Sequence, residues 1–372
     1  MKKIAIVCGE ISGFSYAKLL IKELKKISSS LELVGIAGKN LEEHGVKIIE
    51  EYPPSGFIGF TEVFLRIIPF LRFLKRAEKK IKSEKPDLVV FIDNPGFNLK
   101  LAQRLAGLKK IYYIPPKLWA HEYKRIKIIK KHFSSVITIF PFENALYSKE
   151  GIPCFYFGHP VVDLIEQQNI KEDFWTKTGL KKEKKVIGFF PGSRKSEVVN
   201  LLPVFLKIAS GMGSVSTDVQ FAISSVSKEI KKIIDDIQEK HKTSFHVWEG
   251  NSQALVSASS LCLCASGTMN LEVALVNRPM LVFYKMNVVN YLILRFMIKL
   301  PYISPVNIIG GRQIVPEFLQ NMHYEEIRKR CILLLDNKEE IEKQKEGFRE
   351  TKKLCGNPSV SKKAAEFILK NV

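Results

Sequence analysis

The chain has 372 residues, of which 46% are hydrophobic and 26% are charged. This composition is ordinary for a globular protein and excludes a disordered or collagen-like chain, and the length suggests about two domains. The 58 Lys and Arg residues outnumber the 38 Asp and Glu residues, so the formal charge is +20. Such a charge indicates an anionic partner, which is a nucleic acid, an acidic membrane surface or a phosphorylated substrate.

The N-terminal segment and the cysteines indicate a cytoplasmic protein. Lys2 and Lys3 precede an apolar run that stops at Gly9, which is too short for the core of a signal peptide. The apolar stretch from Met286 to Leu294 is well short of the ~20 residues that a membrane-spanning helix needs. The six cysteines form no CxxC pair with a matching second pair. We therefore expect buried free thiols rather than a structural zinc site.

The first half of the chain alternates apolar, β-rich runs with amphipathic stretches. Helices are expected near residues 15–27, 61–84, 97–108 and 121–131. This alternation is typical of βα units, which build a mostly parallel sheet with helices on both faces. The expected strands are Lys3–Cys8, Leu31–Ile36, Leu88–Ile92, Ile111–Ile114 and Val136–Phe140.

The same pattern restarts after a charged, strand-poor stretch between about Asp163 and Lys185. The expected strands are Val186–Phe190, Val219–Ser224, Leu261–Ala265 and Met280–Tyr284, with helices near 196–212, 227–240 and 268–276. Residues 323–372 are helical and heavily charged, and the last helix is expected to pack back onto the body of the protein. The sequence therefore predicts an α/β protein of two doubly wound domains, 1–165 and 166–350, followed by a C-terminal helix in 351–372.

Ligands of doubly wound sheets bind outside the carboxyl ends of the strands, so the turns after the strands carry the chemistry. The turn Gly9–Gly13 offers free helix-start amides to an anion or a sugar hydroxyl, or it is a simple turn in which Glu10 caps the helix. Asp93 follows the strand 88–92 and precedes a Pro–Gly turn. It is placed either as a general base or as a cap of the next helix.

The second half has two turns of the same kind. Arg194 follows Pro191-Gly192-Ser193 at a helix entrance, which suits a diphosphate, although a surface arginine at a cap looks the same. The small turn Ser266–Thr268 opens a helix that carries Glu272 one turn later. One interpretation is a nucleotide-sugar site, of which this spacing is typical. The other is that Glu272 is an ordinary residue on the face of the helix. Asn307 and Arg312 contact a phosphate or sugar, or they are loop residues bonded to the backbone.

Several functional classes are disfavoured by missing motifs. The sequence contains no GxxxxGK[ST] loop and no GxGxxG, which disfavours a P-loop and a dinucleotide cofactor. The seven histidines show no HxxxH or other ligand spacing. We therefore expect neither a cofactor nor a metal.

Two segments combine basic residues with surplus large apolar residues, namely Glu62–Lys82 and Asn290–Leu300. Basic amphipathic helices of this kind favour the membrane interface, although each segment can also be a core helix with a solvated basic edge. Nucleic-acid binding is disfavoured because the basic residues are interleaved with aliphatic residues and Phe. The expected membrane contacts are Phe64, Leu65, Ile68, Arg72, Phe73, Arg76, Leu292, Arg295, Phe296 and Lys299.

Taken in chain order, these fragments resemble the lipid-A-disaccharide synthases, which are inverting, metal-independent glycosyltransferases of the GT-B fold. The resemblance covers essentially the whole chain and implies two Rossmann-like domains with a cleft between them. It departs from the family pattern at Phe14, Gly96 and Pro115-Pro116-Lys117, all on the acceptor side. The matching fragments are Gly9–Gly13, Gly35–Gly38, Ile58–Val63, Ile92–Pro95, Trp119-Ala120, Pro141–Glu143, Gly158–Pro160, Pro191–Arg194, Ala265–Thr268 with Glu272, and Asn307 with Gly311-Arg312.

The resemblance implies transfer of a sugar from UDP-2,3-diacylglucosamine to 2,3-diacylglucosamine 1-phosphate, in lipid A biosynthesis. Asp93 matches the general base of the family. The implied acceptor-side residues are Glu10, Ser12, Gly13, Asn94 and Asn98. The implied UDP contacts are Gly192, Ser193, Arg194, Ser266, Gly267, Thr268, Glu272, Asn307 and Arg312.

The resemblance also implies a protein attached peripherally to the inner membrane, with no nucleic-acid partner. The oligomeric state stays open. Two alternatives remain from the sequence, a soluble UDP-sugar epimerase of the same fold and a non-catalytic module that binds membranes or nucleic acid.

Overall fold

The computed structural model describes residues 2–9, 11–53, 63–120, 122–167, 174–213, 218–287, 291 and 301–372. The chain divides into two compact units. Unit 1 comprises Met1–Leu164 together with Cys355–Val372, and unit 2 comprises Ile165–Leu354.

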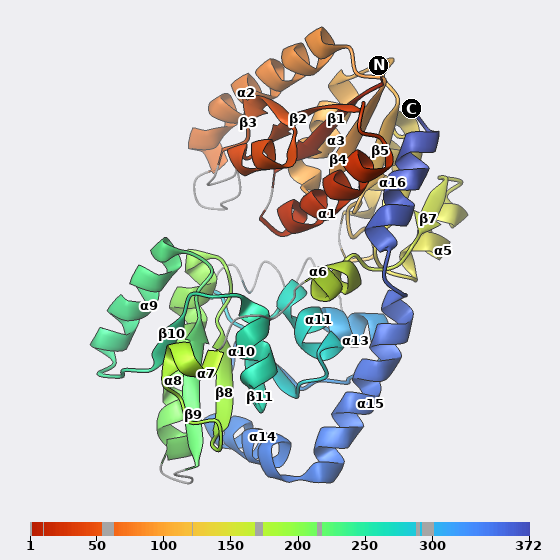
Figure 1. Ribbon diagram of the computed structural model, residues 1–372. Coiled ribbons are helices and arrows are strands. Elements are labelled where there is room, and N and C mark those ends of the chain that lie inside the picture. Colours follow the sequence, from red (N-terminus) through yellow and green to blue (C-terminus); the bar gives the residue numbers. More distant parts are fainter. Residues whose placement is uncertain are drawn as a thin grey trace. The chain divides into compact units, whose positions relative to one another are not determined.

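Unit 1 is built on a seven-stranded parallel sheet (Figure 1). Its strand order is β3-β2-β1-β4-β5-β6-β7, so the order reverses between β1 and β4. At such a reversal the carboxyl ends of two central strands lie side by side, which is where doubly wound sheets bind ligands. The strands are β1 (Lys3–Cys8), β2 (Glu32–Ala37), β3 (Lys47–Glu51), β4 (Leu88–Ile92), β5 (Lys110–Tyr113), β6 (Ser135–Thr138) and β7 (Cys154–Tyr156).

Helices cover both faces of this sheet. Side chains of α2 to α5 pack against one face of the sheet and form a single apolar core with it. Ala5 and Val7 of β1 belong to this core. The alternate residues Ile4 and Ile6 are fully buried under the other face, because successive side chains of a strand point to opposite sides. The helices are α1 (Ile11–Ile27), α2 (Val63–Glu84), α3 (Pro95–Arg104), α4 (Ile126–His132), α5 (Glu143–Lys149) and α16 (Val360–Lys370), with 3₁₀ helices η1 (Lys39–His44) and η3 (Tyr123–Arg125).

The last helix of the chain belongs to unit 1, where α16 packs against α1. Asp163 joins the two ends of the unit, because its carboxylate accepts hydrogen bonds from the backbone N–H groups of Ser359 (2.7 Å), Val360 (3.2 Å) and Ser361 (2.6 Å). The N–H of His159 also donates to the carbonyl of Cys355 at 2.8 Å. Asp163 lies in α6 (Val161–Gln167) and is 4% exposed. A carboxylate at a helix N-terminus satisfies amides that the helix itself leaves unpaired.

Unit 2 contains a six-stranded parallel sheet in the order β10-β9-β8-β11-β12-β13. Here the order reverses between β8 and β11, so the turns that follow these two strands are neighbours. The strands are β8 (Lys185–Phe190), β9 (Val219–Ser224), β10 (His246–Trp248), β11 (Leu261–Ala265), β12 (Met280–Tyr284) and β13 (Glu317–Leu319). The helices are α7 (Phe174–Thr178), α8 (Lys195–Gly213), α9 (Lys228–Lys240), α10 (Ser252–Ala258), α11 (Thr268–Leu275), α13 (Pro305–Gly310), α14 (Tyr324–Asp336) and α15 (Lys338–Cys355).

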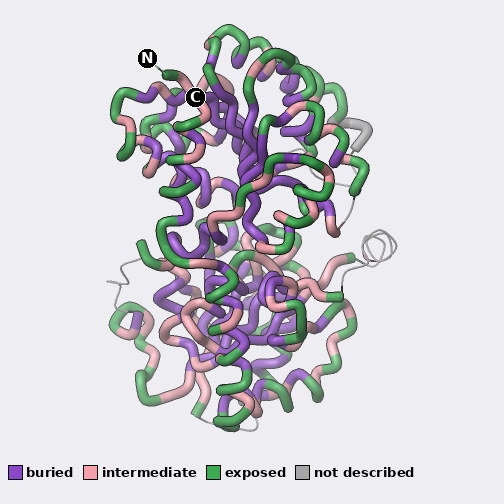
Figure 2. Tube along the Cα trace, turned by 90° about the vertical axis from the view of Figure 1, so that its right-hand side faces the viewer, coloured by how far each residue is buried: buried purple, intermediate pink, exposed green. Residues whose placement is uncertain are grey.

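The predicted fold class is confirmed, since each unit is a parallel α/β sheet covered by helices. The central strands of both sheets are buried, and Figure 2 shows buried residues gathered in the interior of each unit. The cysteines carry free thiols, and all but Cys154 are buried. Within the described part of the chain, no helix combines the length and the apolar character that crossing a bilayer requires.

Candidate active site

Asp93 lies at the carboxyl end of β4, beside the end of β1. Asp93 and Asn94 both adopt left-handed backbone conformations, with φ of 50° and 45°. Two consecutive non-glycine residues in this region are rare and strained, and such strain persists only where the surroundings enforce it. The N-cap of α3 is Asn94, and its side chain makes no capping hydrogen bond. The left-handed pair thus forms a turn that places the Asp93 carboxylate at the edge of the sheet where ligands bind.

Two glycines let α1 approach this turn closely. A Cβ on Gly13 would lie 3.1 Å from the Cβ of Asp93. A Cβ on Gly9 would lie 2.3 Å from Nδ2 of Asn94 and 2.6 Å from the ring of Tyr52. The small residues of the turn that the sequence singled out therefore serve close packing around Asp93. Glu10 lies outside the described residues, as does the side chain of Ser12.

Asn94 and Asn98, which the sequence assigned to substrate binding, are both buried. Asn94 is 3% exposed, and its Nδ2 donates to the hydroxyl of Tyr52 at 2.8 Å. Asn98 is 0% exposed, and its Nδ2 donates to the carbonyls of Asp93 (2.6 Å) and Ile92 (3.2 Å). This corrects the expectation of substrate contact, because both amides bond to protein groups around Asp93 instead of pointing to solvent.

A polar and aromatic cluster follows β5 and β6 in the same unit. The buried Glu143 accepts hydrogen bonds from Nε1 of Trp119 (2.8 Å) and from the N–H of Phe140 (3.3 Å), and burial raises the pKa of Glu143 to about 7. The rings of Trp119 and Phe140 meet edge to face at 5.7 Å, and Phe140 meets His159 at 5.9 Å. Burial lowers the pKa of His159 to about 3, so its imidazole is neutral. Trp119, Glu143 and His159 lie in fragments that match the family, but sequence analysis assigned them no role.

In unit 2, the turn after β8 carries Gly192, Ser193 and Arg194. Gly192 has φ of +109°, and the carboxylate of Glu197 accepts hydrogen bonds from the N–H groups of Ser193 (3.0 Å) and Arg194 (3.2 Å). This contact is one half of a capping box, in which an acidic side chain in the first turn of a helix accepts hydrogen bonds from the backbone N–H groups at the start of that helix. In the structure Glu197 occupies these two amides, and the expected UDP contacts of Gly192 and Ser193 stay predictions. The Arg194 side chain is 62% exposed, with a guanidinium nitrogen 4.0 Å from Glu197.

The turn after β11 lies beside the segment that leads into α13. The hydroxyl of Ser266 donates to the carbonyl of Ile303 at 2.7 Å, and the N–H of Gly267 donates to Oδ1 of Asn270 at 3.2 Å. Thr268 is exposed at the start of α11. One turn further on, Glu272 accepts a hydrogen bond from Nε2 of Gln253 at 2.6 Å. Burial raises the pKa of Glu272 to about 7, so near neutral pH it can either accept or donate a hydrogen bond.

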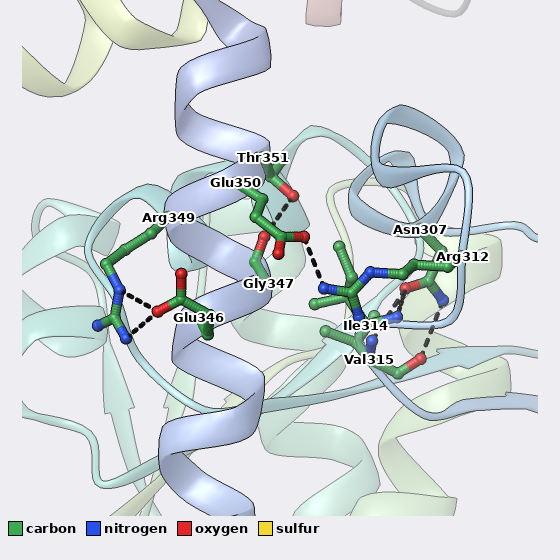
Figure 3. A network of polar contacts seen from close by, with 9 residues as sticks. All are labelled: Asn307, Arg312, Ile314, Val315, Glu346, Gly347, Arg349, Glu350 and Thr351. Atoms are coloured by element: carbon green, nitrogen blue, oxygen red, sulfur yellow. Dashed lines mark hydrogen bonds and ion pairs between the residues drawn. The ribbon is translucent and has the colours of Figure 1, made fainter.

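Asn307 and Arg312 take structural roles in this loop (Figure 3). Asn307 is 0% exposed, and its Oδ1 accepts from the N–H groups of Ile314 (2.7 Å) and Val315 (2.9 Å). Its Nδ2 donates to Glu317 at 2.7 Å and to the carbonyl of Val315 at 2.9 Å. Arg312 forms an ion pair of 2.6 Å with Glu350 of α15. The expected UDP contact of Asn307 is thus corrected, because its side chain is fully buried and bonded within the protein. The Arg312 side chain is 50% exposed, so its contact to UDP stays a prediction.

The outward side of α2 carries exposed aliphatic residues next to basic ones. Ile67, Ile68 and Leu71 are 42%, 60% and 46% exposed. Arg72, Lys75 and Lys79 are exposed on the same side and form no ion pair with another described residue. We call these six residues the α2 outer face.

One expected membrane contact on α2 is contradicted, that of Phe73, while that of Arg76 stays a prediction. Phe73 is 2% exposed and packs against Tyr52 and Phe97, so its expected membrane contact is wrong. Arg76 forms an ion pair of 2.9 Å with Glu50. The side chains of Phe64 and Leu65, as well as Leu292, Arg295, Phe296 and Lys299, lie outside the described residues. Across the described ranges, no group of three or more His, Cys, Asp or Glu residues is arranged to hold a metal ion.

Comparisons with known proteins agree on one family. A family model described as lipid-A-disaccharide synthetase matches residues 4–372. Lipid-A-disaccharide synthase 1 of Legionella pneumophila (strain Lens) is 34% identical over 325 residues, which is 86% of this chain and 84% of that protein. Lipid-A-disaccharide synthase of Persephonella marina is 33% identical over 379 residues, covering 99% of this chain and 98% of the relative.

Solved structures share the fold at low sequence identity. The UDP-GlcNAc 2-epimerase of Neisseria meningitidis bound to UDP-GlcNAc has a TM-score of 0.68 and 16% identity, with 100% of both chains covered. MurG of Acinetobacter baumannii has a TM-score of 0.59 and 11% identity, again with 100% of both chains covered. At these identities the likeness shows a common GT-B fold and nothing about the reaction.

Proposed function

The chain belongs to the lipid-A-disaccharide synthase family of UDP-sugar glycosyltransferases, and from that premise we propose that it joins two acylated glucosamines. The donor is UDP-2,3-diacylglucosamine and the acceptor is 2,3-diacylglucosamine 1-phosphate. The products are the β(1→6)-linked disaccharide 1-phosphate and UDP. The observation that carries the proposal is the Asp93 carboxylate, held in a strained turn where the strand order of unit 1 reverses.

Asp93 acts as the general base of the reaction. Its carboxylate takes the proton from the 6-hydroxyl of the acceptor as that oxygen attacks the anomeric carbon of the donor. The new bond joins the acceptor oxygen to this carbon, and the bond from the carbon to the β-phosphate oxygen of UDP breaks with its electron pair. Attack from the side opposite UDP inverts the anomeric configuration.

Unit 2 binds the UDP part of the donor. Arg194 supplies an exposed positive charge next to the diphosphate and stabilises the charge that develops on the leaving group. The N-terminus of α11, which begins at the exposed Thr268, favours phosphate. Glu272, one turn along α11, accepts hydrogen bonds from the ribose hydroxyls.

Replacing Arg194 with Ala is expected to weaken UDP binding by about tenfold, because one charge-assisted contact to phosphate is lost. The measurement is the dissociation constant of UDP from titration calorimetry. Arg349→Ala is the matched control, since Arg349 is also exposed in unit 2 but pairs with Glu346 on α15. Equal dissociation constants for the unaltered protein and Arg194→Ala would remove Arg194 from the nucleotide site.

The α2 outer face docks the protein onto an anionic membrane surface, where both acylated substrates reside. Its three aliphatic side chains insert among the headgroups, and each of its three cations contributes about 1 kcal/mol near an anionic leaflet. The opposite side of the helix is anchored in the core of unit 1 through Leu74, Ala77 and Ile81. A helix that is fixed on one side and apolar and basic on the other suits peripheral attachment.

Ile68→Glu is expected to reduce co-sedimentation with phosphatidylglycerol-containing vesicles by roughly tenfold. The variant replaces an apolar side chain that inserts into the membrane with a negative charge, which the anionic membrane repels. Ile27→Glu is the matched control, since Ile27 is also an exposed helical isoleucine of unit 1 at 43%. If both variants bind vesicles as the unaltered protein does, the α2 outer face is not the docking surface.

A further inference from the structure

The left-handed conformation of Asp93 is enforced through both polar groups of its backbone. Its N–H donates to the carbonyl of Tyr113 at 3.2 Å. Its carbonyl accepts two hydrogen bonds, one from the hydroxyl of Tyr112 at 2.8 Å and one from Nδ2 of Asn98 at 2.6 Å. A carbonyl oxygen has two lone pairs, so both are used. Strand β5 and helix α3 together determine how the peptide groups around Asp93 are oriented.

The two donors are themselves held firmly. Tyr112 is fully buried in β5, and its ring stacks on Phe133 with centroids 4.9 Å apart. Asn98 is fully buried in the first turns of α3, where its N–H donates to the carbonyl of Asn94 at 3.0 Å. Among the described residues Oδ1 of Asn98 has no hydrogen-bond partner. The hydrogen-bonding capacity that Asn98 uses is therefore that of its Nδ2, which donates to the carbonyls of Asp93 and Ile92.

The orientation of the backbone determines the direction of the Asp93 side chain. Helix α1 approaches Asp93 so closely that a Cβ on Gly13 would lie 3.1 Å from the Cβ of Asp93 and 3.6 Å from its Oδ2. If the Asp93 carbonyl lost a donor, the strained φ of 50° would relax towards the ordinary region, and the carboxylate would turn with it. A base has to lie within hydrogen-bond reach of the hydroxyl that it deprotonates.

We propose that Tyr112 and Asn98 are positioning residues, which aim the Asp93 carboxylate at the acceptor by binding the Asp93 carbonyl. The proposal rests on the role of Asp93 as general base in the proposed function. Neither side chain touches a substrate, since both are fully buried. Removing the Tyr112 hydroxyl should therefore slow the chemical step and leave the binding of the nucleotide unchanged.

The test is Tyr112→Phe, which deletes one hydroxyl and keeps the stacked ring. We expect kcat for disaccharide formation to fall about tenfold or more, with the KM for the UDP-sugar donor and the dissociation constant of UDP unchanged. Tyr147→Phe is the matched control, because Tyr147 is also fully buried and its hydroxyl donates to the carbonyl of Pro116 at 2.8 Å. Both variants should lower the melting temperature by a similar amount, and the control should keep its kcat.

A double-variant cycle separates positioning from general loosening of the fold. In an Asp93→Asn background, Tyr112→Phe should not lower the residual rate any further, because the group that it positions is already gone. A Tyr112→Phe enzyme with the same kcat as Tyr147→Phe would overturn the proposal, and so would an additional loss in the Asp93→Asn background. If Asp93→Asn itself kept full activity, the proposed function of Asp93 would fail, which is a different result.

Discussion

Asp93→Asn is expected to lower kcat by a factor of about 10² to 10⁴, the usual contribution of a general base. The amide keeps the size and shape of the carboxylate but cannot accept the proton of the acceptor hydroxyl. Asparagine also tolerates the left-handed backbone at this position, so the hydrogen bonds to the Asp93 carbonyl remain. The melting temperature and the dissociation constant of UDP should stay unchanged. Initial rates of disaccharide formation, together with calorimetry, measure all three quantities.

Asp235→Asn serves as the control for Asp93→Asn, since Asp235 is an exposed residue of α9 paired with Lys231 at 2.9 Å. It should behave like the unaltered protein in every assay. An Asp93→Asn protein with near-normal kcat would show that another group accepts the proton. A fall in kcat accompanied by loss of UDP binding would show that the variant damages the fold rather than the chemistry.

Asp163→Ala should lower the free energy of unfolding by about 3–5 kcal/mol, because a buried charged acceptor of three backbone N–H groups is removed. Ser359, Val360 and Ser361 would keep their amides but lose the acceptor that joins α16 to α6. Urea unfolding measures the loss. Hydrogen exchange should locate it, with amides of α16 exchanging faster while those of β8 in unit 2 stay protected.

The control for this variant is Asp336→Ala. Asp336 also forms an ion pair, with Lys185, but its side chain is 60% exposed. Exposed pairs contribute at most about 1 kcal/mol, so the control should lose little stability. A loss from Asp163→Ala no larger than that from Asp336→Ala would mean that α16 is held by its apolar contacts alone.

The central strands could be predicted from the sequence, whereas the edge strands could not. β1, β4, β9, β11 and β12 have the predicted bounds, because strands buried on both faces are continuous apolar runs. The four strands that sequence analysis missed are β3, β7, β10 and β13, which are the edges of the two sheets. β3 reads Lys-Ile-Ile-Glu-Glu and is half exposed, and the other three have three residues each. Short, half-solvated strands leave no periodic signal.

The candidate site was predictable where it depends on the ends of buried strands. Asp93, Arg194 and Glu272 became candidates because each lies shortly after a buried strand, and their roles stay predictions. Asn98 and Asn307 were misassigned because an asparagine that supports a loop has the same sequence signature as one that binds a ligand. Their partners are backbone groups, which a sequence does not reveal. Glu197 was overlooked although its spacing from Arg194 is that of a capping box.

The membrane contact expected of Phe73 was wrong because the sequence of α2 contains more than one possible apolar stripe. Ile67, Phe70, Leu71 and Leu74 look like one apolar stripe by themselves. In the structure the buried side of α2 is formed by Phe73, Leu74, Ala77 and Ile81. Ile67 and Leu71 lie on the other side and are exposed. The additional turns determine which side of an amphipathic helix packs on the core.

Product analysis with both acylated substrates tests the central claim most directly. The purified protein is incubated with UDP-2,3-diacylglucosamine and 2,3-diacylglucosamine 1-phosphate, and the lipid products are identified by mass spectrometry and NMR. We predict one β(1→6)-linked disaccharide 1-phosphate for each UDP released, and no UDP release when the acceptor is omitted. Epimerised UDP-sugar, or UDP release that does not depend on the acceptor, would contradict the assignment of a disaccharide synthase.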